Sequence, residues 1–181
     1  MSPRNPRHRE REARRKPAQF ELGSRALYEH PRYYDHAYRA HRADVAFYVK
    51  LARKHPGPVL ELGAGTGRIT LALARAGVRV VGVDRSPDML ARAAERAAQL
   101  PAEARERIEL CRGDMRSLRL RQRFSLVLAP FNLFMHLYSR RDIERTLASV
   151  RAHLAPRGRF ALDVLMPDLG ALRRDPGRVY R

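Results

Sequence analysis

Three closely spaced glycines and one later aspartate are the residues that most suggest chemistry. Gly63, Gly65 and Gly67 follow a short apolar stretch directly. Glycine lets the backbone turn sharply and approach a ligand closely, and a helix that starts at such a turn directs its amide groups at the ligand. Asp84 ends the next apolar stretch, where a carboxylate can accept hydrogen bonds from two ribose hydroxyls. The pattern predicts a ligand that contains ribose.

The neighbours of the glycine turn discriminate between ribose-containing ligands. A dinucleotide fingerprint requires glycine at position 68, where a pyrophosphate would lie on the helix end, but Arg68 occupies that position. Glu61, just before the turn, would repel a pyrophosphate and would help to hold a ligand that carries an ammonium and a sulfonium group. NAD is therefore disfavoured, and a partly cationic ligand is expected.

Five short apolar segments are predicted to be the strands that position these residues. Such runs, bounded by glycine, proline or charged residues, are typical of buried strands. Strands are expected at 58–62, 78–83, 107–112, 124–129 and 158–165.

Capping patterns and helical spacing predict the helices between the strands. Ser86 before Pro87 is a favourable helix start, and Ser139 precedes Asp142 at capping-box spacing. Two helical pieces are expected between residues 24 and 55. The apolar faces expected from helical spacing are Val45, Val49 and Ala52 in the second of these pieces, and Ile143, Leu147, Val150 and Leu154 before the last strand.

Apolar strands that alternate with helices predict an α/β fold in which helices cover both faces of a parallel, doubly wound sheet. Residues 1–18 are expected to be a disordered basic tail, because they contain seven basic and two acidic residues and almost nothing apolar. An N-terminal helical segment is expected over 19–56, and the core domain over 57–181.

The composition bounds the classes of partner. The 37 basic and 19 acidic residues give a net charge of +18, which favours an anionic partner such as nucleic acid, although only three of the basic residues are lysines and the skew towards arginine resembles a compositional bias. Cys111 is the only cysteine, which excludes an intrachain disulfide and argues against a zinc cluster; no metal is expected. The absence of a secretory signal or a membrane-length apolar run predicts a cytoplasmic protein without membrane contact.

Four motifs in sequence order carry a family resemblance: "VLELGAGTGRIT", "VVGVDRSPDML", "CRGDMRSL" and "LAPFNLFMHL". Together they resemble the motifs of class I S-adenosylmethionine-dependent methyltransferases over roughly residues 33–170. The resemblance implies a Rossmann-like, mainly parallel sheet of order 3-2-1-4-5, S-adenosylmethionine as cofactor, and methyl transfer as the activity.

The same resemblance implies roles for individual residues. Glu61, Gly63 and Gly65 would hold the methionine part of the cofactor, and Asp84 would hold the ribose. Asp114 would accept a hydrogen bond from the adenine amino group, with Met115 beside the ring. The other cofactor contacts that it implies are Ala64, Arg85, Met89 and Pro130.

An upstream tyrosine pattern narrows the resemblance to one group of methyltransferases. Tyr34, Asp35 and Tyr38, followed by Asp44, are similar to the lid of small-molecule N-methyltransferases of the glycine and amino-sugar type, whose loop after the fourth strand also carries a histidine. The resemblance implies that both tyrosines contact cofactor or substrate and that His136, with Tyr34, serves catalysis as an acceptor-side base or orienting group. A small-molecule acceptor with a nitrogen or oxygen nucleophile is expected.

Two alternatives to an active small-molecule enzyme remain open from the sequence. The basic charge favours an RNA methyltransferase, although "LAPFN" lacks the full N/D-P-P-aromatic signature of amino-group methylation on bases. The family fold also ends in an antiparallel hairpin after the fifth strand, and this sequence stops soon after that strand. The chain is therefore expected to be truncated, and the edge of its fifth strand is expected to be open to pairing in a homodimer. The second alternative is a non-catalytic fragment that at most binds the cofactor.

Overall fold

The computed structural model of the protein describes residues 28–166. The predicted basic tail, the start of the predicted helical segment and the residues after 166 lie outside this range.

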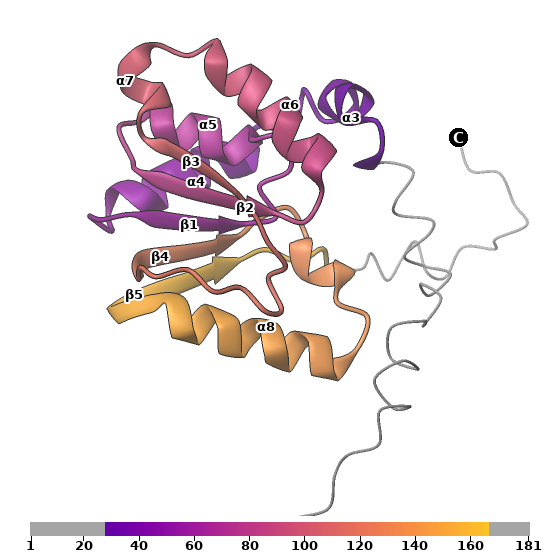
Figure 1. Ribbon diagram of the computed structural model, residues 1–181, viewed down its shortest axis with the longest axis vertical. Helices are drawn as coiled ribbons and strands as arrows, with labels where there is room; N and C mark the ends of the chain where they lie inside the picture. The colour runs from indigo at the N-terminus through magenta and orange to yellow at the C-terminus, as the bar shows by residue number, and fades with distance from the viewer. Residues whose placement is uncertain (1–27, 167–181) are drawn as a thin grey trace, which may run out of the picture.

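A five-stranded parallel sheet forms the centre of the described chain (Figure 1). The order is β3-β2-β1-β4-β5, and each strand runs parallel to its neighbours. All four residues of β1 are buried, as expected for a strand with neighbours on both sides and helices on both faces. The doubly wound class and the order implied by the resemblance are thereby confirmed. The strands are β1 (Val59–Leu62), β2 (Val80–Asp84), β3 (Ile108–Arg112), β4 (Phe124–Ala129) and β5 (Leu154–Leu162).

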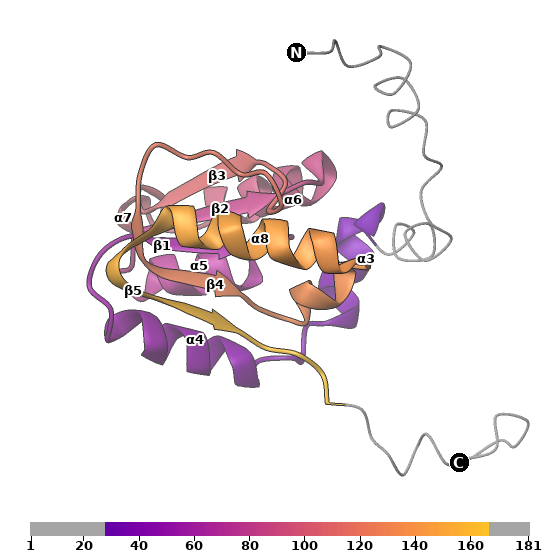
Figure 2. The same ribbon diagram turned by 90° about the horizontal axis from the view of Figure 1, so that it is seen from below.

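Helices cover the sheet in two layers. Figure 1 shows α4, α5 and α6 on one face and α8 on the other, and Figure 2 shows α8 from its own side. The short α7 and the 3-10 helix η1 lie in connections, and α3 stands before α4 in the chain. The bounds are α3 (Pro31–Ala37), α4 (Ala43–Arg53), α5 (Arg68–Arg75), α6 (Pro87–Ala98), α7 (Ala102–Arg105), η1 (Leu133–His136) and α8 (Arg140–His153).

The predicted helix starts are confirmed. The Ser86 hydroxyl accepts a hydrogen bond from the Met89 amide at 3.3 Å, and the Ser139 hydroxyl accepts one from the Asp142 amide at 3.1 Å. Each serine satisfies one of the amide groups that a helix leaves unpaired at its first turn. Helix α6 therefore begins next to the end of β2, where Asp84 lies.

The apolar face of α4 packs on the sheet largely as predicted. Ala52 is buried, Val45 and Val49 pack partly buried against the same core, and Tyr48 is almost fully buried between them. This helix contacts α5 and the core residues of β1 and β4. The segment before β1 is therefore anchored to the sheet through α4.

The predicted apolar face of α8 is wrong at two positions. Ile143 and Leu147 are 37% and 44% exposed, whereas Thr146, Val150 and His153 face inward. The polar members of this stripe can be buried because they have partners: the Thr146 hydroxyl donates to the Asp142 carbonyl, and His153 Nε2 accepts from the Leu120 amide at 2.9 Å.

The predicted bounds of the last strand are also wrong. Helix α8 ends at His153 and the chain enters β5 at once, so Leu154 belongs to a strand that ends at Leu162. A register shift between Phe124 and Leu126 of β4 accompanies this early start. Within the described range β5 pairs only with β4 and lies at the sheet edge, and none of the helices in that range is long and apolar enough to span a membrane.

Gly67 allows a test of how tightly the glycine turn is packed. Its φ is +81°, and a Cβ there would collide with Leu71 Cδ1 and lie 3.3 Å from the Ala93 Cβ. Gly77 has a similar φ of +85°, but a Cβ there would meet nothing within 4 Å. We expect Gly77→Ala to cost about 1–2 kcal/mol from left-handed strain alone, and Gly67→Ala to cost roughly 1–3 kcal/mol more from overpacking.

Urea denaturation of the two variants measures this difference in the free energy of unfolding. Equal losses would show that the close contacts around Gly67 relax without cost.

Candidate active site

A cavity of about 410 Å³ opens at the carboxyl ends of β1, β2, β3 and β4. Strand β1 lies between β2 and β4, where the direction of the connections reverses, and ligands of open α/β sheets bind at such a point. The cavity volume is in the range of small-molecule sites. The sequence-predicted residues that line it are Tyr34, Gly63, Gly65, Asp84, Arg85, Met89, Asp114, Met115, Pro130 and His136.

Three of the predicted residues do not line the cavity. Ala64 is buried behind the turn, and Glu61 is 1% exposed within the core. Tyr38 instead packs its ring against Tyr34 and Phe131, with centroid distances of 4.7 and 4.8 Å. No cluster of metal-ligating side chains occurs among residues 28–166.

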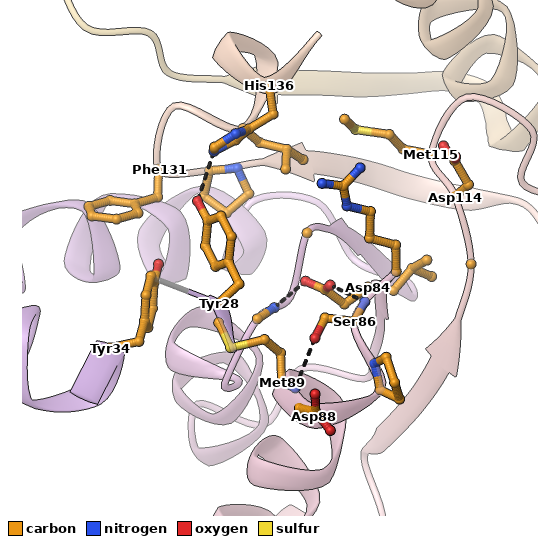
Figure 3. A pocket seen from close by; sticks show the side chains of 18 of the residues that line it. Tyr28, Tyr34, Asp84, Ser86, Asp88, Met89, Asp114, Met115, Phe131 and His136 are labelled. Carbon is orange, nitrogen blue, oxygen red and sulfur yellow. Dashed lines mark hydrogen bonds between the residues drawn. The ribbon is translucent and has the colours of Figure 1, made fainter. Parts of the chain in front are cut away.

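The Asp84 carboxylate joins the glycine turn to the end of β2 (Figure 3). Its Oδ2 accepts a hydrogen bond from the Gly65 amide at 2.8 Å, and its Oδ1 accepts one from the Ser86 amide at 2.9 Å. Each carboxylate oxygen has a second lone pair, so the group can still accept bonds from a ligand. Gly65 has a φ of +55°, and a Cβ there would come within 3.5 Å of Met89 Cε. That distance is an ordinary contact, so the left-handed backbone conformation is the reason for glycine at this position.

Glu61 is neutral in the folded protein at neutral pH. Burial raises the pKa of its carboxyl group to about 8, and this effect outweighs the hydrogen bond from the Thr70 hydroxyl and the charge of Arg68, which act in the opposite direction. A protonated carboxyl group behind the turn does not offer the negative charge that the sequence interpretation required of it.

A second carboxylate lines the cavity at the end of β3. Asp114 accepts hydrogen bonds from the Arg116 amide at 2.9 Å and from the Arg116 guanidinium at 2.7 Å. Although partial burial acts against it, this pairing holds the pKa of Asp114 below its usual value. An ionised acceptor therefore stands beside Met115, across the cavity from Tyr34 and Phe131 (Figure 3).

Tyr28 is a site residue that the sequence interpretation missed. Its hydroxyl lies 2.8 Å from Nε2 of His136, and its ring lies 5.8 Å from that of Tyr34 (Figure 3). Burial raises the pKa of Tyr28 to about 12 and that of Tyr34 further, whereas burial, helped by the charge of Arg85, lowers the pKa of His136. Both phenols therefore keep their protons at neutral pH, and the imidazole is uncharged.

Residues 28–42, which we call the N-terminal arm, pack on the loop after β4 through aromatic rings. Phe131 is the centre of this contact: the ring of His41 lies 5.1 Å from it, and the Arg68 guanidinium lies 4.8 Å from its centroid. Together with Tyr34 and Tyr38, these groups form a cluster that we call the aromatic wall, and Tyr34 and Phe131 of this cluster line the cavity.

Two carboxylates attach the arm and α4 to the core. Asp35 accepts hydrogen bonds from the Thr66 hydroxyl at 2.6 Å and from Arg92 and Arg96 of α6 at 2.8 and 2.9 Å. The Asp44 carboxylate accepts hydrogen bonds from both terminal guanidinium nitrogens of Arg68, Nη1 and Nη2, at 2.6 Å. Such bidentate, charge-assisted pairs are among the stronger hydrogen bonds in proteins. Since α3 buries no residue, these contacts and the aromatic wall hold it in place.

Comparison with known proteins identifies the domain. The family model described as "Methyltransferase domain" matches residues 59–158. A glycine/sarcosine N-methyltransferase of Parasynechococcus marenigrum (strain WH8102) is 33% identical over 76% of this chain and 50% of its own length. A dTDP-3-amino-3,6-dideoxy-alpha-D-glucopyranose N,N-dimethyltransferase of Streptomyces fradiae is 31% identical over 67% of this chain and 44% of its own.

A solved structure gives the same result at the level of the fold. The glycopeptide N-methyltransferase MtfA, complexed with S-adenosylmethionine, superposes with a TM-score of 0.61 at 35% identity, over 71% of this chain and 53% of that one. The chain spans about half the length of the relatives that it matches.

The buried Glu61 predicts an unusual pH dependence of stability. In the folded protein the Glu61 carboxyl group stays neutral up to its raised pKa, whereas in the unfolded chain it ionises above the ordinary glutamate pKa. The contribution of the neutral Glu61 to the free energy of unfolding is complete below the ordinary glutamate pKa and is lost as the pH rises towards about 8. We expect Glu61→Gln, which is neutral at every pH, to gain stability relative to the wild type by up to about 1.4 kcal/mol per pH unit between pH 5 and 8.

Urea denaturation of both proteins at several pH values measures this difference. A constant difference across the range would contradict a neutral Glu61.

Proposed function

The chain belongs to the methyltransferase-domain family, and on that premise we propose that it binds S-adenosylmethionine and transfers a methyl group to a small-molecule nucleophile. The observation that carries this proposal is the cavity at the switch point of the sheet, with the Asp84 and Asp114 carboxylates on its wall. The relatives named above are N-methyltransferases, which supports an amine as the acceptor in this chain.

The residues of the cavity fit this cofactor. Gly63 and Gly65 present bare backbone to the cavity, so a ligand can approach it closely. Asp84 retains lone pairs for ribose hydroxyls. Both oxygens of Asp114 already accept from Arg116, so an adenine amino group would share or replace one of these hydrogen bonds. The side chains of Met89 and Met115 supply apolar contact surface in the cavity lining. We do not extend the proposal to Glu61, because its carboxyl group is outside the cavity lining and neutral.

The bound cofactor would supply an already activated methyl group, so that the protein has chiefly to position the acceptor and exclude water. The aromatic wall of the N-terminal arm suits both tasks, and we propose that the arm serves as the lid of the site. Tyr34 lines the cavity with a protonated hydroxyl, which makes it a hydrogen-bond donor and not a base.

His136 is the group that we propose for the acceptor side. With its proton on Nε2, the ring donates to the Tyr28 oxygen and leaves Nδ1 able to accept a proton from the acceptor. With the proton on Nδ1, the ring accepts from Tyr28 and can orient the acceptor only. In both forms Tyr28 fixes the direction of the ring.

The other sequence-based expectations differ in their support. The RNA alternative depends on the net charge of +18, and none of the contacts described above favours it. The homodimer through β5 and the cytoplasmic location stay predictions. The alternative of a fragment that only binds cofactor is separated from an active enzyme by the two experiments below.

Replacement of Asp84 is expected to weaken cofactor binding. Asp84→Asn loses a charged acceptor, and a hydrogen bond to a charged group contributes about 1.5–3 kcal/mol. The affinity for S-adenosylhomocysteine should therefore fall by roughly 10- to 100-fold. Asp88→Asn is the matched control, because it removes the same charge from an exposed position at the cavity. Calorimetric titration with S-adenosylhomocysteine, and with NAD as a negative control, measures both.

Two outcomes of this titration count against the proposal. Equal affinities of the two variants would remove Asp84 from the cofactor site, and no binding by the folded wild type would remove the cofactor itself.

Replacement of His136 is expected to slow methyl transfer without changing cofactor affinity. Loss of a positioned acid–base group costs about 10²- to 10⁴-fold in rate. The wild-type rate should fall as the pH drops through the lowered pKa of His136, below its usual 6.5, because the ring then gains a proton. His136→Gln should lose this pH dependence. Steady-state assays with an amine found in a panel that includes glycine and sarcosine measure the effect.

Tyr28→Phe serves as the companion variant, since it removes the partner of the ring and leaves the ring in place. A His136→Gln enzyme with the wild-type rate and pH profile would exclude a role in transfer.

A further inference from the structure

The loop after β4 has a strained backbone. Phe131 and Asn132 are consecutive and have φ values of +59° and +60°, in the left-handed region that favours glycine. Asparagine tolerates this region, but a bulky residue such as phenylalanine is a genuine outlier there. Strained residues of this kind persist only where surrounding contacts hold them, and they gather at functional sites.

Asp163 supplies the contacts that hold this loop. Its Oδ2 accepts a hydrogen bond from the Phe131 amide at 3.0 Å, and its Oδ1 accepts one from the Asn132 amide at 2.6 Å. The hydroxyl of the buried Tyr48 donates to the same carboxylate at 3.1 Å. Asp163 directly follows β5, whose Leu162 pairs with Ala129 at the end of β4, so the sheet itself places the carboxylate beneath the loop.

The loop that Asp163 holds carries three parts of the site. Phe131 is the centre of the aromatic wall. Leu133 packs against the glycine turn, since a Cβ on Gly63 would lie 3.0 Å from Leu133 Cδ2. His136 ends η1, which begins directly after Asn132, and faces Tyr28 across the cavity. A change of the backbone at 131 and 132 would therefore move the whole acceptor side.

We propose that Asp163 is the positioning residue of the acceptor side: its carboxylate holds Phe131 and Asn132 in the left-handed conformation that aims His136 into the cavity. This inference rests on the proposed function, because the term acceptor side assumes that the protein transfers a methyl group to an acceptor. The two carboxylates of the cofactor side depend less on Asp163, since Asp84 ends β2 and Asp114 comes shortly after β3. The loop reaches the glycine turn through Leu133.

The experiment follows the His136 ring directly. The imidazole resonances of the protein are titrated by NMR, with His136 assigned by its loss in His136→Gln, and binding of S-adenosylhomocysteine is measured by calorimetry on the same samples. The titratable and charged groups that bear on this ring are Tyr28, Asp84 and Arg85. We expect Asp163→Asn to bring the His136 pKa back up towards 6.5, because the released ring reaches water, while the affinity for S-adenosylhomocysteine stays within about twofold.

Two further variants separate positioning from a general loss of stability. Tyr48→Phe removes one donor from Asp163 but neither loop amide, and should leave the His136 titration as in the wild type. Asn132→Gly in the Asp163→Asn background should restore the low pKa in part, because glycine adopts the left-handed conformation without strain. Asp163→Glu keeps the carboxylate on a longer side chain and should shift the His136 pKa in the same direction by less, which keeps the test open if Asp163→Asn does not fold.

The outcomes distinguish the role of Asp163 from the proposed function. An unchanged His136 titration in both Asp163→Asn and Asp163→Glu, or no recovery in the double variant, would overturn the role of Asp163. A wild type that shows the expected titration but does not bind S-adenosylhomocysteine would overturn the proposed function and leave the structural role of Asp163 standing.

Discussion

The Asp84 carboxylate is the interaction on which the geometry of the site depends. Its two oxygens accept amide hydrogen bonds from Gly65 and Ser86, and so they fix the turn after β1 relative to the turn after β2. Parallel strands bring these two turns to one edge of the sheet, but parallel pairing alone does not set their conformations. With this bridge in place, α5 and α6 start at defined positions, and Met89 of α6 packs against the open side of Gly65.

The two sides of the cavity are built by different physical means. The side formed by β1, β2 and β3 is local, since its residues lie at the end of a strand or within a few positions after it. The acceptor side is assembled from segments far apart in the chain: Tyr28 reaches His136, and Asp163 holds the loop after β4. Polar and aromatic contacts between these segments take the place of a shared apolar core, because α3 buries no residue.

This division explains what the sequence could predict. Local patterns predicted the strands and the residues Gly63 and Asp84 at their ends, and the family resemblance added the strand order and the role of Asp114. These three residues were therefore predicted to lie at one site, and they do. The roles of Tyr28 and Asp163 depend on contacts over more than thirty positions, and no local pattern marks them. The state of Glu61 was missed because its charge depends on burial, which a motif does not show. The inward face of α8 was misjudged because buried Thr146 and His153 have partners that the sequence does not reveal.

The attachment of the N-terminal arm has a consequence for its response to the solution. Asp35 and Asp44 hold the arm and α4 to Arg92, Arg96 and Arg68, and these side chains are between 13% and 32% exposed, so dissolved ions reach them. Screening weakens partly exposed ion pairs, whereas it leaves the apolar contacts within the sheet almost unaffected. Ionic strength thus acts selectively on the cover of the cavity, and a rise in salt concentration shifts the arm towards release while the sheet and its carboxylates keep their positions.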